Sequence, residues 1–315
     1  MRRKRKMTLN KINTKQAYEE FIQEKTARNL SEETLATYSI HIKNYLDSAD
    51  LWDVPTDCLT KSTYEQWISK LKSDNRKKDV TITSYCRSVR TFLYWLQDNE
   101  YAEACDLRLP KYQKTIKECY TNNELKRLLK NPLPCSEVNY QTWVFINLIC
   151  ATGMRLKSAL NIRVSDIEVD EHAIYIQTTK NKHAQIFFIG NEMISILTKY
   201  IRLFDLDEND YLFCTADKNR PAKRTIQENV AKYNLSCGVK KTSIHLFRHT
   251  FAKNYYNQTK DIYTLSHILG HSSIATTEHY LRDLGINPAD TTAYNPQVIY
   301  GTKPRPKKRR SKINL

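Results

Sequence analysis

Residues 243–281 read SIHLFRHTFAKNYYNQTKDIYTLSHILGHSSIATTEHYL, and they decide how this 315-residue chain is interpreted. Five of its eight histidines lie between His245 and His279. His245 and Arg248 are three residues apart, so they share one face of a helix expected at 243–257. A guanidinium fits a phosphate with two parallel hydrogen bonds, and a histidine adds a donor or moves a proton. The pair has the minimum needed to grip a phosphodiester, although a polar niche with a surface ion pair is the commoner interpretation of so short a motif.

Zinc binding is a competing interpretation, because His245/His249 and His267/His271 are both spaced at i, i+4. However, no glutamate follows His245 as in an HExxH motif, and the charge of Arg248 disfavours a neighbouring dication. The chain also lacks GxGxxG and GxxxxGK[ST] motifs, which bind nucleotides. We therefore expect no metal and no other cofactor.

Three further motifs favour a functional interpretation of the first one. ATGMRL at 151–156 precedes it, and LGHSS at 269–273 and IATTEHYL at 274–281 follow. In this order, with a lysine-containing hairpin between the first two, the four motifs resemble those of the tyrosine recombinase family, which includes phage integrases and Xer-like recombinases. The resemblance covers residues 118–281 strongly. The N-terminal helices resemble the family's core-binding domain only by their pattern.

The resemblance implies a set of catalytic residues in this sequence. Tyr280 matches the nucleophile only by its position after LGHSS, since the chain has 20 tyrosines. Lys180 matches the hairpin lysine by its distance from the second strand, with Lys182 as the alternative. The chain departs from the family at Met154, where leucine is usual, and at Ser158, where many relatives have glutamate. The expected catalytic set is Arg155, Lys180, His245, Arg248, His271 and Tyr280.

The resemblance also implies an activity and an assembly. Arginines and histidines would stabilise charge on the phosphorus while the tyrosine forms a 3′-phosphotyrosyl bond, so neither metal nor ATP is required. The expected partners are double-stranded DNA with a specific recombination site and three further copies of the chain. These would form a homotetramer on two duplexes, from a free monomer or dimer, with a DNA-bending or directionality factor as a possible accessory.

The expected fold is mainly α-helical with a small antiparallel β-hairpin or sheet, an α+β class. Four amphipathic helices in the first hundred residues predict a SAM-like core-binding bundle. Thr121–Glu124 reads as a capping box that opens the catalytic domain, and 173–178 and 185–189 read as its hairpin strands. We expect a basic arm at 1–13, the bundle at 14–103, a linker at 104–117, the catalytic domain at 118–285 and a C-terminal segment at 286–315.

Positive charge is concentrated at the two ends of the chain. The net charge is +16, of which residues 1–6 contribute five positive charges and 303–312 seven. Such tails attract phosphate without sequence preference. Residues near the fourth helix are candidates for DNA contacts, although a solvated polar face is the commoner interpretation. With the alternative hairpin lysine, these candidates are Arg76, Lys77, Lys78, Arg87, Arg90 and Lys182.

Composition excludes other classes of protein. At 40% hydrophobic residues the chain can bury a core, and no apolar run is long enough to span a membrane. The basic N-terminus lacks the apolar stretch of a secretory signal, and the eight cysteines are scattered. We therefore expect reduced thiols in a cytoplasmic, nucleoid-associated protein without a membrane partner.

Four roles remain open. The tails and lysine-rich composition favour an integrase of a mobile element, with a Xer-type chromosome or plasmid dimer resolvase as the alternative. A type IB topoisomerase-like enzyme would use a similar site but act as a monomer without a target sequence. A catalytically silent DNA-binding accessory protein is disfavoured, because a decayed site should have lost at least one catalytic residue.

Overall fold

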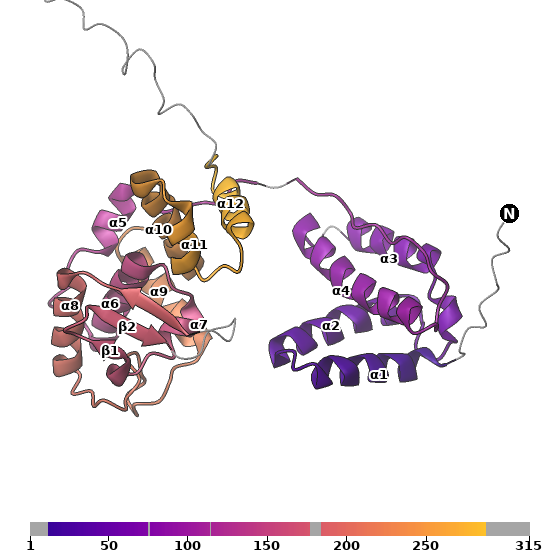
Figure 1. Cartoon of the computed structure of the whole chain (residues 1–315), viewed down its shortest axis with the longest axis horizontal. Coiled ribbons are helices and arrows are strands. Elements are labelled where there is room, and N and C mark those ends of the chain that lie inside the picture. Colours follow the sequence, from indigo (N-terminus) through magenta and orange to yellow (C-terminus); the bar gives the residue numbers. More distant parts are fainter. Residues whose placement is uncertain (1–11, 75, 114, 177–183, 288–315) are drawn as a thin grey trace, which may run out of the picture. The chain divides into compact units, whose positions relative to one another are not determined.

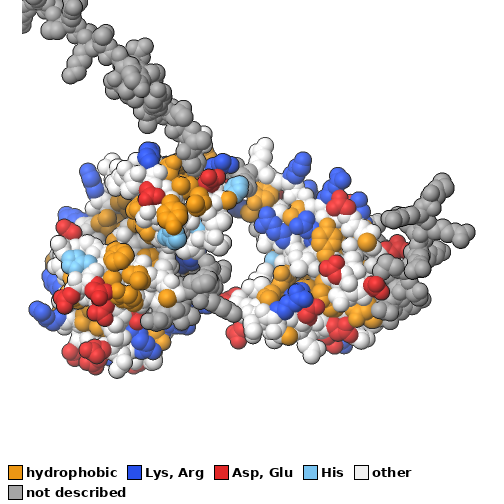
Figure 2. All heavy atoms as spheres, in the orientation of Figure 1, with side chains coloured by type: hydrophobic (Ala, Val, Ile, Leu, Met, Phe, Trp, Pro, Cys, Tyr) orange, Lys and Arg blue, Asp and Glu red, His pale blue; other side chains and the backbone are white. Residues whose placement is uncertain are grey.

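A computed structural model describes residues 12–74, 76–113, 115–176 and 184–287. The chain divides into two compact units, residues 1–114 and 115–315, each described here by itself (Figure 1). The mainly helical composition with one small sheet confirms the expected fold class. On the faces drawn in Figure 2, basic and acidic side chains are interspersed over both units.

The first unit is a bundle of four helices. They are α1 (Thr14–Ala27), α2 (Glu32–Ser48), α3 (Lys61–Ser73) and α4 (Asp79–Asp98), with a 3-10 turn η1 (Thr56–Cys58). Side chains of Asn13, Ser31 and Thr60 cap the first three helices by accepting backbone hydrogen bonds. Aromatic rings fill the centre, with Phe21 edge-on to Phe92 at 5.3 Å between ring centroids. These contacts bury the apolar stripes that the sequence predicts.

Segments at both ends of this bundle pack against it. Asn13 caps α1 and bridges to Pro55, so residues 12 and 13 lie in the bundle and not in a basic arm. Residues 1–11 of the expected arm lie outside the described part of the chain. At the other end, Leu107 is buried in the core of the bundle, and Thr83 donates a hydrogen bond to the carbonyl of Pro110. The first half of the expected linker therefore belongs to the packed unit.

The second unit surrounds the apolar helix α6 (Glu137–Thr152), which packs on α8, α9 and α10. The capping box predicted at Thr121–Glu124 is present and opens α5. The other helices include two short ones: α7 lies directly after Arg155, and the 3-10 turn η2 was not predicted from the sequence pattern. In chain order the helices other than α6 are α5 (Asn122–Leu128), α7 (Leu156–Ala159), η2 (Val164–Asp166), α8 (Asn191–Leu203), α9 (Lys223–Ser236), α10 (Ile244–Thr259), α11 (Ile262–Ile268) and α12 (Ile274–Asp283).

The sheet of the second unit has three antiparallel strands in the order β1-β2-β3. They are β1 (Ile167–Glu168), β2 (Ala173–Ile176) and β3 (Gln185–Phe188). Ala173 pairs with Phe188 and Ile176 with Gln185, which is the hairpin that the sequence predicts, and β1 extends it along β2. The connection at 177–183 lies outside the described residues, and Lys180 and Lys182 lie within it.

A separate apolar cluster holds the last helix in place. It comprises Ala252, Tyr256, Leu265, Leu269, Leu281 and Leu284, contributed mainly by α10, α11 and α12. All eight cysteines are free thiols. In the part of the chain that the structure describes, no helix is both long and apolar enough to cross a membrane.

Candidate active site

The turn that presents the first arginine requires a glycine. Gly153 ends α6 with φ 62°, in the left-handed region that L side chains rarely adopt. A Cβ at this position would also lie 2.3 Å from Cδ1 of Phe251. Two residues later, Arg155 has extended backbone angles and forms the N-cap of α7. The turn at Gly153 therefore sets the direction of the Arg155 side chain.

We expect Gly153→Ala to lower the free energy of unfolding by about 1–3 kcal/mol, because strain in the left-handed region adds to overpacking against Phe251. Gly190→Ala is the matched control, since Gly190 has no positive φ and its added Cβ would meet only Glu192 at 3.3 Å. Urea unfolding of both variants measures the difference. Equal stabilities would show that the turn relaxes without cost.

Arg248 joins two turns that are far apart in the sequence. Its side chain is 3% exposed, with Nη1 donating to the carbonyl of Gly153 and Nη2 to that of Leu269, both at 2.7 Å. Burial, and then the nearby charge of Arg155, lower the pKa of Arg248 to about 10, so it stays charged at neutral pH. The two bonds occupy part of a five-donor guanidinium and leave other N–H groups for an anion.

The turn after α11 brings a histidine to the same place. Gly270 has φ 59°, and a Cβ there would be 3.4 Å from Nη1 of Arg155. His271 follows, and its Nδ1 lies 2.9 Å from Oγ1 of the buried Thr277 on α12. Burial, followed by the charges of Arg248 and Arg155, lowers the pKa of His271 to about 4. The imidazole is therefore neutral at pH 7, with its orientation fixed by the helix that carries Tyr280.

Tyr280 lies between two imidazoles. Its ring meets the rings of His249 and His271 edge-on, each at 5.5 Å between centroids. The hydroxyl oxygen is buried and makes no hydrogen bond of ordinary geometry with the described residues, although Arg248 approaches it as a donor. Burial raises the pKa of Tyr280 to about 12, against the opposing effect of the charges of Arg248 and Arg155. In the free protein the phenol is therefore neutral, with both arginines close enough to act on it.

His245 lies at the open side of the site. With Arg248 it lines a cavity of about 550 Å³ that extends to α9, where Arg224 and Gln227 are exposed. Desolvation by surrounding atoms, and then the charges of Arg248, Lys117 and Arg155, lower the pKa of His245. The sequence motifs did not single out Arg224 or Gln227, because only the fold brings α9 beside α10.

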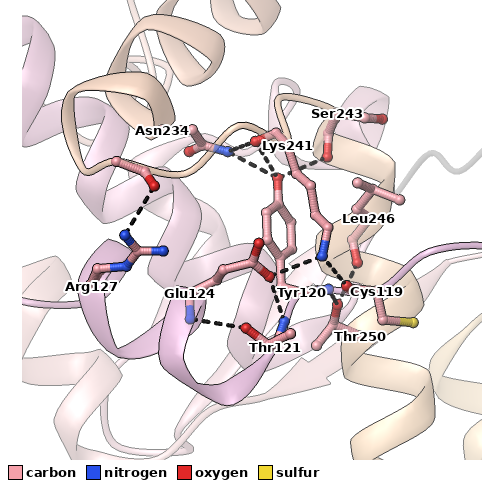
Figure 3. A network of polar contacts seen from close by, with 11 residues as sticks. Cys119, Tyr120, Thr121, Glu124, Arg127, Asn234, Lys241, Ser243, Leu246 and Thr250 are labelled. Carbon is pink, nitrogen blue, oxygen red and sulfur yellow. Dashed lines mark hydrogen bonds and ion pairs between the residues drawn. The ribbon is translucent and has the colours of Figure 1, made fainter.

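A network of hydrogen bonds fixes the start of α10 (Figure 3). Oη of Tyr120 donates toward the carbonyls of Lys241 and Ser243, and its backbone N–H donates to Oγ1 of Thr250 at 2.8 Å. Nζ of Lys241 bonds to Oε2 of Glu124 at 3.0 Å and to the carbonyl of Cys119 at 2.9 Å. The segment before α5 is therefore bound along the helix that carries His245 and Arg248.

The same segment reaches the helix of Tyr280. The backbone N–H of Lys117 donates to the carbonyl of Asp283 at 2.8 Å, and its Nζ pairs with the carboxylate of Asp283 at 2.9 Å. This ammonium also lies 5.6 Å from the ring centroid of Tyr280. The sequence analysis assigned Lys117 to the linker, whereas the structure packs it beside the nucleophile candidate. Pairing between residues 117 and 283 leaves no local sequence signal.

Five of the six expected DNA-contacting residues lie in the connection before α4 and on α4 itself, and the sixth, Lys182, lies outside the described residues. Arg76 and Lys77 both pair with Asp74, at 3.0 and 3.8 Å, and Lys78 is the N-cap residue of α4. Arg87 is exposed, whereas Arg90 is half-buried and lies 5.8 Å from the ring centroid of Tyr94. Arg87 and Arg90 therefore have different surroundings, and their contacts with DNA remain predictions.

The buried histidines predict an acid-sensitive fold. Burial first, and then the charges of His245, Lys117 and Arg248, lower the pKa of His249 to about 4, against an opposing effect of the Glu118 backbone. As pH falls from about 6.5 toward 4, the unfolded chain takes up a proton that folded His249 does not, so stability falls.

We expect His249→Phe to reduce the slope of the unfolding free energy against pH by up to about 1.4 kcal/mol per pH unit. Urea unfolding of DNA-free protein between pH 5 and 7.5 measures the slope. Above about pH 7 the slopes of the variant and the wild type should coincide, because the imidazole is then neutral in both states. Parallel curves throughout the range would contradict the lowered pKa.

Comparison with known proteins identifies the class. A model described as "Phage integrase family" matches residues 118–284, just over half of the chain. A "Tyrosine recombinase" of Pseudothermotoga lettingae is 28% identical over 261 residues, covering 81% of this chain and 88% of that protein. "Tyrosine recombinase XerC" of Staphylococcus epidermidis is 28% identical over 271 residues, with the same coverage of both chains.

Solved structures share the fold. A lambda integrase(75-356) dimer bound to a COC′ core site gives a TM-score of 0.70 at 16% identity, covering 87% of this chain and 97% of that one. The Tn1549 transposon integrase in complex with transposon right end DNA gives a TM-score of 0.68 at 19% identity, covering 85% of this chain and 94% of that one. The chain therefore belongs to the phage integrase family, and it is a tyrosine-type site-specific DNA recombinase.

Proposed function

We propose that the chain cleaves and rejoins DNA through a covalent 3′-phosphotyrosyl bond formed by Tyr280. One observation carries this proposal: α10, α12 and the turns after α6 and α11 bring two arginines, two histidines and Tyr280 to one site. Arg248 binds the backbone of both turns, while Arg155 approaches Gly270 and Tyr280 contacts His271. A silent accessory protein would have no need of so complete a set.

The chemistry follows from the charges in the site. Arg155 and Arg248 bind the two non-bridging oxygens and stabilise the negative charge that builds up around the phosphorus. The phenol oxygen of Tyr280 attacks the phosphorus, and the bond to the 5′ oxygen breaks. His245 and His271 orient the phosphate and assist removal of the phenol proton.

Lys180, or Lys182 in the other hairpin register, then protonates the departing 5′ oxygen. A 5′ hydroxyl from a partner strand reverses the step, so one phosphodiester is exchanged for another and no ATP is consumed. Because the two guanidiniums supply the positive charge that a metal ion provides in other phosphoryl-transfer enzymes, we expect full activity in excess chelator.

We propose that four copies act together on two duplexes. A solved fold relative is a lambda integrase tetramer bound to a Holliday junction, with a TM-score of 0.70 at 16% identity. The C-terminal residues 282–302 are the candidate segment for docking between protomers, and residues 288–302 of this segment lie outside the described part of the chain. Because Asp283 and Leu284 anchor α12, the test deletes only residues 288–302, which should abolish assembly and spare weak DNA binding.

Double-stranded DNA with a specific site is the proposed substrate. The cavity beside His245 and Arg248 continues to α9, which makes Arg224 and Gln227 candidates for contacts next to the cleaved phosphate. In the first unit, exposed Arg76, Lys78 and Arg87 are the candidates. Loss of a phosphate contact should weaken binding to all sequences and reduce its salt dependence, whereas loss of a base contact should alter the site preferred.

We propose integration and excision of a mobile element as the biological role. The fold relatives include a transposon integrase, and both chain ends are strongly basic. The named relatives XerC and XerD favour dimer resolution as the second candidate.

Covalent trapping tests both the chemistry and the role. The protein is incubated with fragments of its source DNA in excess chelator and denatured in detergent, and the attached fragments are sequenced. We expect an adduct on the 3′ side of a break with a free 5′ hydroxyl, at sites flanking a mobile element. A single site shared by chromosome or plasmid copies would favour the resolvase, and relaxation of any supercoiled DNA by monomers would favour a topoisomerase.

A further inference from the structure

His249 is a buried polar side chain for which the chemistry above has no use. It follows Arg248 on α10 and is 6% exposed, and neither ring nitrogen makes a hydrogen bond of ordinary geometry with the described residues, although the Glu118 backbone lies near enough to affect its pKa. Buried polar atoms are nearly always paired, and leaving one unpaired costs about 1–3 kcal/mol. A phenylalanine would fill similar space without that cost. The unpaired imidazole therefore lowers the stability of the free protein. We infer that its nitrogen has a hydrogen-bond partner in another state of the protein.

The unpaired atoms point to that state. Four buried side-chain polar atoms in the described residues lack partners, and three of them belong to His249 and Tyr280. The rings of these two residues are in edge-on contact, at 5.5 Å between centroids and 69° between planes. A neutral imidazole has one acceptor nitrogen, and a phenol has one O–H donor. The two residues therefore carry complementary hydrogen-bonding groups on rings that are already in contact.

Two other polar groups near Tyr280 already have a hydrogen-bond or ion-pair partner. Nδ1 of His271 is taken by Thr277, and Nζ of Lys117 pairs with Asp283. His249 is also in edge-on contact with His245, at 4.9 Å between centroids, so it lies between the nucleophile candidate and the open side of the site. Because its pKa is lowered to about 4, it is uncharged at neutral pH and keeps an acceptor nitrogen.

We propose that His249 is a positioning residue for the nucleophile: when DNA is bound, a ring nitrogen of His249 accepts a hydrogen bond from the Tyr280 hydroxyl and aims its oxygen at the phosphorus. This inference rests on the proposed role of Tyr280. In this proposal His249 orients the O–H and takes no proton. The phenol proton leaves by the route given above.

Single-turnover cleavage of a DNA duplex carrying the trapped site tests the proposal. We expect His249→Phe, which keeps a ring of similar size but no acceptor, to slow cleavage at least tenfold while DNA binding and thermal stability are retained. His249→Asn and His249→Gln place an amide oxygen near Nδ1 and Nε2 respectively, and one of them should recover most of the rate. His279→Phe is the control, because His279 is exposed and adjacent to Tyr280 in sequence.

A second substrate separates action on the nucleophile from action on the leaving group. With sulfur in place of the bridging 5′ oxygen, departure needs no protonation, so variants that lack the general acid recover. We expect the defect of His249→Phe to persist on this substrate. Wild-type cleavage by His249→Phe, recovery on the sulfur substrate, or failure of both amide variants would each overturn the proposal. Adduct formation by Tyr280→Phe would instead overturn the proposed function.

Discussion

Tyr280→Phe is expected to abolish the covalent protein–DNA adduct, with cleavage reduced more than about 1000-fold and DNA binding unchanged. The substitution removes one oxygen, which is the atom that attacks the phosphorus. The ring that packs against His249 and His271 remains, and the apolar cluster under α12 does not involve the hydroxyl. Because that hydroxyl is buried without a partner among the described residues, its loss should not destabilise the fold.

The measurement is detergent-resistant adduct formation on a nicked duplex, beside a binding assay in the same buffer. Tyr263→Phe is the matched control, since Tyr263 is on the neighbouring helix α11 and 60% exposed. An adduct of normal yield with Tyr280→Phe would move the nucleophile to another residue. An adduct lost equally with Tyr263→Phe would indicate general damage to the unit.

Arg248→Lys is expected to slow cleavage at least about 100-fold and also to lower thermal stability. A guanidinium can bind two carbonyls and still offer a phosphate further donors in a fixed plane, whereas an ammonium is a point charge with three donors. In Arg248→Lys a single nitrogen on a shorter side chain must serve the carbonyls of Gly153 and Leu269, which Nη1 and Nη2 now serve separately, so the geometry of both bonds cannot be kept. Removal of one donor to a transition-state oxyanion typically costs 10²–10³ in rate.

Arg155→Lys separates the effect on cleavage rate from the effect on thermal stability. No hydrogen bond from Arg155 to a carbonyl is recorded in the described residues, so this variant should lose rate with a smaller change in melting temperature. Arg202→Lys, at an exposed residue in the last turn of α8, is the control for both. Each rate is measured well below the melting temperature of its variant. Wild-type cleavage by Arg248→Lys would show that this arginine only braces the turns.

The fold was largely predictable because its signals are local. Helix periodicity predicted the four helices of the bundle, and Thr121–Glu124 predicted the start of α5, since caps and amphipathic stripes act within a few residues. The strand β1 was missed because two residues form too short a pattern to recognise. The 3-10 turn η2 was missed for the same reason, since it has three residues.

The sequence by itself determined the family, the order of the motifs and the identities of the candidate catalytic residues, because each motif combines a turn or helix with the side chain it presents. The tertiary structure alone decided which groups surround Tyr280. Lys117 reaches it through pairing with Asp283, and His249 through the packing of α12 on α10. Contacts between residues so far apart in sequence leave no periodicity or spacing, since they arise only when separate helices are packed together.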